Sequence, residues 1–115
     1  MPHKPAKLLQ DILDAGRGIQ SFVAGRTIDD YNNQLMLRSA VERQFEIIGE
    51  ALNRLRHLDP VLVERLGPYQ KIIAFRNIIA HGYEVLDAAI VWQVIHDYLP
   101  ALLEQSRQLL SDVEA

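Results

Sequence analysis

The chain contains no cysteine, only five prolines and six glycines, few aromatic side chains and no long hydrophobic run. The absence of cysteine excludes a disulfide scaffold and every Cys-ligated zinc or iron–sulfur site, and it fits a reducing cytoplasm. The longest apolar runs, such as residues 88–92, fall far short of the roughly 20 residues that a membrane-spanning helix needs. An amphipathic stretch follows the first five residues, so we expect no secretory signal. We therefore expect a cytoplasmic protein with no membrane span, metal or cofactor.

Helical periodicity accounts for nearly all of the 115 residues, which we assign to a single domain over residues 1–115. Apolar positions recur every three or four residues over residues 6–23, 33–57, 69–81 and, after Asp87, as far as about residue 110. A shorter helical turn is expected between Asp59 and Leu66. No strand pattern is present. The sequence predicts an all-α fold, an up-down four-helix bundle with an additional short helix.

Residues at the ends of these segments have the chemistry of helix starts and stops. Thr27 followed by Asp30 resembles a capping pair, and Asp59 before a proline is a typical helix start. Gly82 is suited to end the helix of residues 69–81. Pro100 lies inside the last helical pattern, and we expect it to kink that helix near Asp97.

Charge is unevenly distributed along the chain. The net charge is −3, but residues 1–37, 38–76 and 77–115 carry 0, +2 and −5. A polyanion would therefore meet the middle third, although a charge run is more often a solvated face. The basic residues of that third are Arg38, Arg43, Arg54, Arg56, Arg65, Lys71 and Arg76.

The helix predicted over residues 69–81 has apolar residues on two sides. With about 100° per residue, one side is an ordinary core face containing Ile72, Phe75, Ile78 and Ile79. The other side combines small or apolar residues with two polar ones: Ile73, Ala74, Ala80, Asn77 and His81. Arg76 falls on the border between the two sides. Because a bundle needs one apolar stripe per helix, the second side predicts contact with another molecule, most simply a two-fold homodimer.

Arg76, Asn77, His81 and Tyr83 are the candidate functional residues, and no carboxylate is among them. Histidine transfers protons near neutral pH, and arginine offers a fork of donors for phosphate oxygens. Asn77 is one turn before His81 and can orient its ring or bind a substrate oxygen. This set suits metal-free RNA cleavage by the ribose 2′-hydroxyl. A homodimer would bring two histidines and two arginines to one site.

Structural explanations of the same residues remain open. His81 alone is suited to cap the helix carboxyl end, and Arg76 alone could pair with Glu84 or Glu46. Tyr83 alone could be a core-edge tyrosine, and Asn77 a packing residue. Arg38, Glu42 and Glu46 lie one turn apart and either pair along the helix, which we favour, or line a cleft. The remaining histidines have no evident companions, and we assign them no role.

The segment Arg76-Asn77-Ile78-Ile79-Ala80-His81-Gly82-Tyr83 resembles the arginine, four residues, histidine, one residue, tyrosine motif of HepT toxins, within the HEPN group of helical ribonucleases. Residues 38–43 and 46–51, and Val91-Trp92, are also similar to this family. The resemblance covers about residues 6–110.

The resemblance implies a ribonuclease toxin of a two-gene toxin–antitoxin module. Its partner would be a minimal nucleotidyltransferase antitoxin (MntA-like), which transfers AMP from ATP to the motif tyrosine, here Tyr83. The family also forms homodimers with the motif in the cleft between subunits. Two other interpretations stay open: a non-catalytic helical subunit that docks onto and regulates a nucleotidyltransferase, and a plain structural dimer. The acidic last third favours the former of these two, because it suits a basic partner better than RNA.

Overall fold

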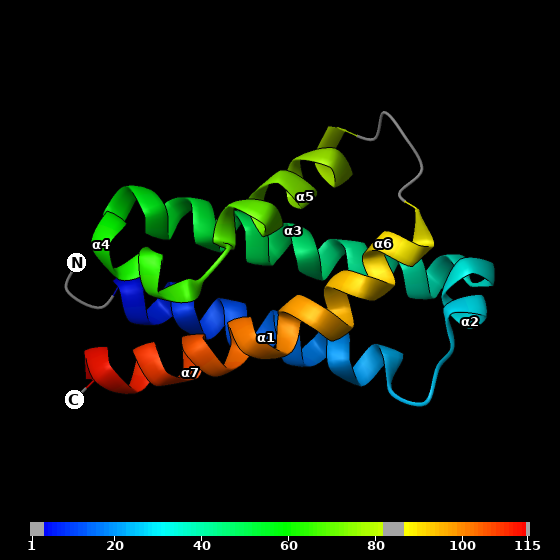
Figure 1. Cartoon of the computed structure of the whole chain (residues 1–115), viewed down its shortest axis with the longest axis horizontal. Helices are drawn as coiled ribbons and strands as arrows, with labels where there is room; N and C mark the ends of the chain where they lie inside the picture. Colours follow the sequence, from blue (N-terminus) through cyan, green and yellow to red (C-terminus); the bar gives the residue numbers. More distant parts are fainter. Residues whose placement is uncertain (1–3, 82–86, 115) are drawn as a thin grey trace.

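A computed structural model describes residues 4–81 and 87–114, without the side chains of residue 4 and residues 79–81, and all of its regular elements are helical (Figure 1). The predicted all-helical class is confirmed. None of the described helices is long and apolar enough to cross a membrane. The elements are α1 (Lys4–Val23), α2 (Ile28–Asn33), α3 (Leu35–Leu58), α4 (Pro60–Val63), a 3-10 turn (Glu64–Leu66), α5 (Tyr69–His81), α6 (Ala88–Gln93), a π turn (Val94–Tyr98) and α7 (Leu99–Glu114).

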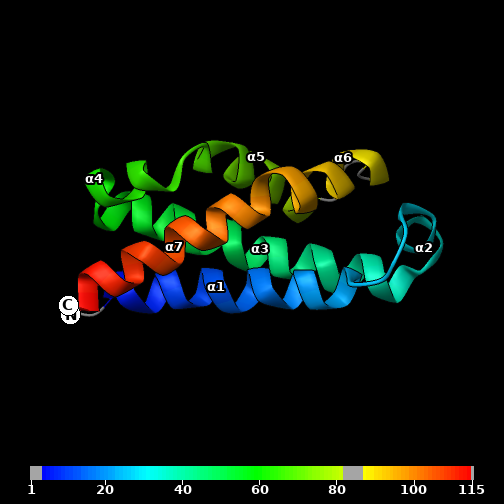
Figure 2. The same ribbon diagram turned by 60° about the horizontal axis from the view of Figure 1, so that its bottom comes forward.

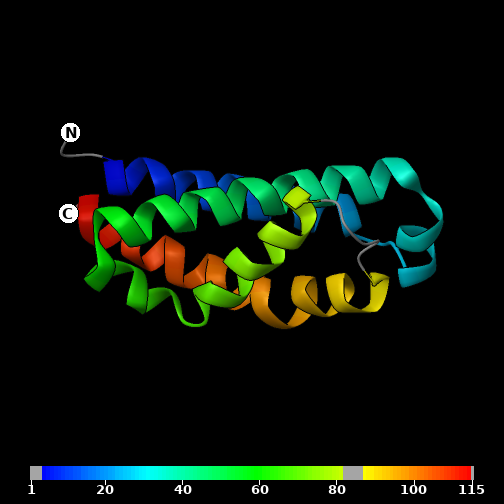
Figure 3. The same ribbon diagram turned by 90° about the horizontal axis from the view of Figure 1, so that it is seen from above.

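The long helix α3 holds the structure together. It packs against α1 along one side and against α5 along another, while α7 lies along α1 (Figure 1, Figure 2). Seen from above, α5 crosses α3 obliquely (Figure 3). The short helices α2 and α6 contact each other at one end of an elongated molecule of 43 × 29 × 20 Å. Arg76, Asn77 and His81 of the candidate motif therefore lie on α5, which packs on α3.

The core is built from the apolar stripes that the sequence predicts. Leu9, Ile12 and Ile19 of α1 are fully buried, as are the α3 residues that recur at helical spacing: Val41, Phe45, Ile48, Leu52 and Leu55. Phe45 meets Phe75 of α5 edge to face, with ring centroids 5.0 Å apart, a geometry that aromatic pairs prefer. These contacts fix α5 against α3, and so position the residues that α5 carries.

The predicted helix starts and stops are confirmed where the structure describes them. Thr27 and Asp30 form a reciprocal capping box at the start of α2, and the Asp59 side chain accepts the backbone N–H of Leu62 at 3.0 Å. Asp87 caps α6 in the same way. The expected role of Gly82 lies outside the described residues.

The last helical run departs from α geometry where Pro100 predicts a disturbance. Residues 94–98 form a π turn, and the backbone N–H of Leu99 donates to the carbonyl of Val94, five residues back. Pro100 has no backbone N–H, so it cannot donate the α-helical hydrogen bond that its own position would otherwise make. The wide turn thus connects α6 to α7 without a break in the helical path.

Candidate functional site

Arg76 lies in the middle of the packed side of α5, not on its border. Among the described side chains of this helix, the buried ones are Tyr69, Ile72, Ile73 and Phe75, and in helical projection Arg76 falls between Ile72 and Ile73. Two predictions were therefore wrong. Ile73, expected on the partner-facing side, belongs to the chain's own core, and Ile78, expected in the core, is 48% exposed. Compared with the prediction, α5 is rotated about its axis, because the stem of Arg76 takes a core position.

A glycine on α3 makes room for that arginine. A Cβ built on Gly49 would lie 2.3 Å from Cβ and 2.5 Å from Cγ of Arg76, far inside normal contact distance. Any side chain at position 49 would therefore push α5 away from α3 or displace the arginine stem. The two helices approach closely at this point so that the stem of Arg76 packs on bare backbone.

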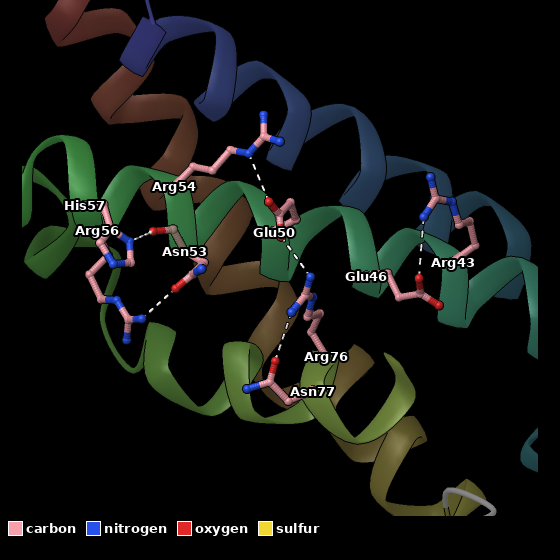
Figure 4. Close-up of polar contacts among 9 residues, drawn as sticks. All are labelled: Arg43, Glu46, Glu50, Asn53, Arg54, Arg56, His57, Arg76 and Asn77. Carbon is pink, nitrogen blue, oxygen red and sulfur yellow. Dashed lines mark hydrogen bonds and ion pairs between the residues drawn. The ribbon is translucent and has the colours of Figure 1, made fainter. Parts of the chain in front are cut away.

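The guanidinium of Arg76 is oriented by two neighbours (Figure 4). Its Nη2 donates to Oε2 of Glu50 at 2.8 Å, and its Nη1 donates to Oδ1 of Asn77 at 3.0 Å. The other oxygen of Glu50, Oε1, accepts from Nε of Arg54 at 3.0 Å. One carboxylate thus joins two guanidinium groups, which leaves the three groups with a net charge of +1.

The free-energy contributions typical of such contacts show whether they act mainly on the stability of the fold or on a reaction. The side chains of Arg76 and Glu50 are 30% and 40% exposed, and ion pairs that reach solvent contribute about 0–1 kcal/mol to stability. An oriented donor facing developing charge contributes more, about 2.7–4 kcal/mol to a transition state. The pair matters more for holding a cation in one orientation than for the stability of the fold.

A groove of about 280 Å³ opens beside this pair, between α1 and α3. Arg76 and Glu50 lie on its wall, and Arg43, Glu46 and Arg54 continue along α3. Arg43 and Glu46 form a loose pair, with Nη1 and Oε2 3.5 Å apart. Because the arginine and its carboxylate both reach this groove, a ligand in it can contact the guanidinium directly.

The structure brings together only part of the predicted site. Arg76 and Asn77 are adjacent and hydrogen-bonded, and α5 continues to His81 as predicted, so the histidine follows Asn77 by one turn. The side chain of His81 and the whole of Tyr83 lie outside the described residues. Of the two carboxylates that the sequence offered as partners of Arg76, Glu46 is wrong, because the described contact is with Glu50, and Glu84 lies outside the described residues.

The expected ion pairs among Arg38, Glu42 and Glu46 do not form between these described residues. Arg38 instead reaches back to the backbone carbonyl of Asn32 in the last turn of α2, where a helix end leaves carbonyls without partners. Burial raises the pKa of Glu42, an effect that the positive charge of Arg38 partly offsets. The favoured prediction of a salt-bridged face is therefore wrong for Arg38 and Glu42.

Sequence reasoning assigned no site role to Gly49 or Glu50, and it named Arg54 only among the basic residues of the middle third. The spacing of Glu50 and Arg54 is that of an ordinary surface pair on a helix. Nothing in the spacing of Glu50 and Arg76, 26 residues apart, indicates that they meet. A glycine in the middle of α3 was the one local signal, because glycine there weakens a helix unless another backbone or stem approaches closely.

An all-helical protein with an arginine fixed beside a surface groove fits the helical ribonucleases to which the motif points. The chain belongs to the Ribonuclease HepT-like family, whose model matches residues 12–109. This confirms the resemblance and supports a ribonuclease function.

Proteins similar to this chain carry ribonuclease names. "Putative RNase MJ1380" of Methanocaldococcus jannaschii is 28% identical over 99 residues, which cover 84% of this chain and 88% of that protein. "Putative RNase TTE0752" of Caldanaerobacter subterraneus subsp. tengcongensis is 28% identical over 108 residues, or 92% and 94% of the two chains. "Probable ribonuclease HepT" of Thermococcus cleftensis is 28% identical over 98 residues, or 82% and 84%. No solved structure matches the chain.

Proposed function

We propose that this protein is a metal-independent endoribonuclease toxin of a toxin–antitoxin module. The observation that carries the proposal is the fixed guanidinium of Arg76, packed on Gly49 and held by Glu50, one turn and one residue before His81. Family membership and the ribonuclease names of the relatives support the same reaction class.

In the proposed reaction, the ribose 2′-oxygen attacks the adjacent phosphorus and the 5′-oxygen leaves. The new P–O2′ bond gives a 2′,3′-cyclic phosphate, and the proton lost by the 2′-hydroxyl ends on the 5′-oxygen. His81 is the group that moves this proton, and Arg76 stabilises the charge that builds on the phosphate oxygens. Asn77 orients Arg76 through the contact between its Oδ1 and Nη1 of the arginine. Glu50 is a positioning residue, because it acts through Arg76.

The proposed site is completed by a second copy of the chain. The motif provides one histidine per chain, whereas the reaction needs both a proton acceptor and a proton donor. A two-fold dimer would supply a second motif histidine. The exposed Ile78, two residues after Arg76 on the same helix, supports a contact near the motif. The homodimer is part of the proposal.

The proposed control is covalent modification of Tyr83 by a nucleotidyltransferase antitoxin. The tyrosine oxygen would attack the α-phosphorus of ATP, pyrophosphate would leave, and the tyrosine would lose its proton and carry AMP. The phosphate of AMP on Tyr83, seven residues after Arg76, can bind the Arg76 guanidinium and repel an incoming RNA backbone.

Intact-mass spectrometry after coexpression with the neighbouring gene tests both parts, alongside RNA cleavage in EDTA by the protein made alone. We expect a mass increase of whole AMP units that maps to Tyr83, and cleavage only by the unmodified form. No modification and no cleavage would contradict the proposal and favour a non-catalytic subunit that docks onto a nucleotidyltransferase.

A further inference from the structure

A second hollow lies directly next to the groove beside Arg76. It has a volume of about 710 Å³ and shares Leu8, Asp11 and Arg54 with the first groove. It continues between α1 and α3 towards Lys7, Asn53 and His57. Because the two hollows share these three lining residues, they adjoin each other, and we call the two together the channel. No role in the proposed reaction has been given to this larger part.

Arg54 stands at the junction of the two hollows and is tied to the site. Its Nε and Nη2 of Arg76 contact the two oxygens of Glu50, so only one carboxylate separates the two guanidinium groups. Two cations this close can hold two neighbouring phosphates of one nucleic acid strand, while a single small anion would need only one of them. The Arg54 side chain is 69% exposed, so it is accessible from the channel.

Beyond Arg54 the channel has the features of a nucleobase pocket. Leu8 and Leu58 give it apolar surface, and Leu58 is 47% exposed. Nδ1 of His57 lies 2.7 Å from the backbone oxygen of Asn53, and this contact fixes the ring. The amide of Asn53 is fixed as well, because its Oδ1 accepts from Nη2 of Arg56 at 2.5 Å (Figure 4). A flat ring and an oriented amide beside apolar surface suit an unpaired base.

The charges of this hollow also favour a polyanion. Of the described residues that line it, Lys7 and Arg54 are positive and Asp11 is acidic. The Lys7 ammonium pairs with Asp11 at 2.5 Å, and this contact raises the pKa of the lysine, which stays charged at neutral pH. Over the two hollows together, four basic lining residues outnumber three acidic ones, which leaves a net charge of +1: Lys7, Arg43, Arg54 and Arg76 against Asp11, Glu46 and Glu50.

We propose that the channel between α1 and α3 is a binding site for single-stranded RNA, in which Arg54 holds the phosphate next to the scissile one and His57 and Asn53 contact the flanking base. The proposal rests on the proposed function, because Arg76 marks the scissile phosphate. Bases that are paired in a duplex cannot enter such a pocket, so the substrate is single-stranded.

The test measures RNA affinity apart from cleavage. Fluorescence anisotropy in EDTA follows binding of a 2′-O-methylated single-stranded RNA of about six nucleotides, which has no free 2′-hydroxyl to attack. The variants are Arg54→Gln, His57→Ala and the double variant. Arg107→Gln is the matched control, because Arg107 forms a similar exposed pair with Glu104 on α7. Thermal unfolding of each variant verifies that it is folded.

We expect the double variant to bind about tenfold more weakly, and Arg54→Gln to reduce the slope of log affinity against log salt by about one. Arg107→Gln should match the parent. Equal affinity and equal salt slope for parent and double variant would overturn the proposal. So would a change in oligomeric state without a change in RNA affinity, since the channel would then be a protein interface.

Cleavage of unmodified RNA separates this proposal from the previous one. If the parent cleaves RNA and the double variant binds it equally well, the channel is wrong and the ribonuclease assignment stands. If the parent cleaves no RNA but the Arg54→Gln variant binds RNA more weakly than the parent, the channel stands and the ribonuclease assignment is wrong.

Discussion

Gly49 of α3 and Arg76 of α5 pack directly against each other: the glycine has no side chain, and the stem of the arginine fills the space that a side chain would take. A Cβ at position 49 would lie 2.3 Å from Cβ of Arg76. The guanidinium then extends to Glu50, the next residue on α3. Two consecutive residues of α3 thus position Arg76: Gly49 because it has no side chain, and Glu50 through its carboxylate.

Gly49→Ala should destabilise the protein although alanine is the better helix former. In an open helical position this change stabilises by about 0.5–1 kcal/mol, but here the new methyl group overlaps Arg76, and overpacking costs about 1–3 kcal/mol. Gly18→Ala in α1 is the matched control, because its Cβ would meet only Phe22 at 3.9 Å. We expect denaturant unfolding to show opposite signs for the two variants. A stabilising Gly49→Ala would contradict the close packing.

Glu50→Gln should impair RNA cleavage while leaving the fold nearly unchanged. The exposed pair contributes about 0–1 kcal/mol to stability, but a loosened Arg76 is expected to lower kcat by about 10- to 100-fold. Glu104→Gln breaks a similar exposed pair on α7 and should leave kcat unaffected. Steady-state cleavage kinetics and melting temperatures measure the two effects separately. A Glu50→Gln variant with parental kcat would show that the carboxylate does not position Arg76.

Glu42→Gln should stabilise the protein near neutral pH. Burial raises the pKa of Glu42 above its ordinary value of 4.5, so the folded state keeps a proton that the unfolded state has already lost. Stability is therefore lost as pH rises from the unfolded to the folded pKa, and it stays lower above that range. We expect the melting temperature of the variant to exceed that of the parent at about pH 7. The difference should shrink towards about pH 3.5, and a constant difference would contradict this explanation.

The sequence predicted the helices well because their signals are local. The apolar stripe of α3, the capping box of Thr27 and Asp30 and the start at Asp59 each depend on residues a few positions apart. The rotation of α5 could not be predicted in the same way. Its sequence has apolar residues on two sides, so periodicity alone could not tell that Ile73 is buried and Ile78 exposed.

The candidate site was predicted as a motif, but not as an environment. Arg76 and Asn77 could be named from their spacing to His81, whereas the contact between Arg76 and Glu50 joins residues that are 26 positions apart on different helices. Such a contact depends on how α5 crosses α3, which in turn depends on the missing side chain at Gly49. Apart from Gly49 itself, local patterns contain no information on that crossing. The channel beyond Arg54 was missed for the same reason, because it lies between α1 and α3.

The most direct test of the central claim is the rate of RNA cleavage in EDTA by the purified protein and by its His81→Ala variant. The account predicts cleavage by the parent, products ending in 2′,3′-cyclic phosphate, and a loss of about 100- to 10,000-fold in the variant, the range typical of a lost general acid or base. Cleavage by His81→Ala at the parental rate would contradict the claim that the Arg76 and His81 motif carries ribonuclease activity.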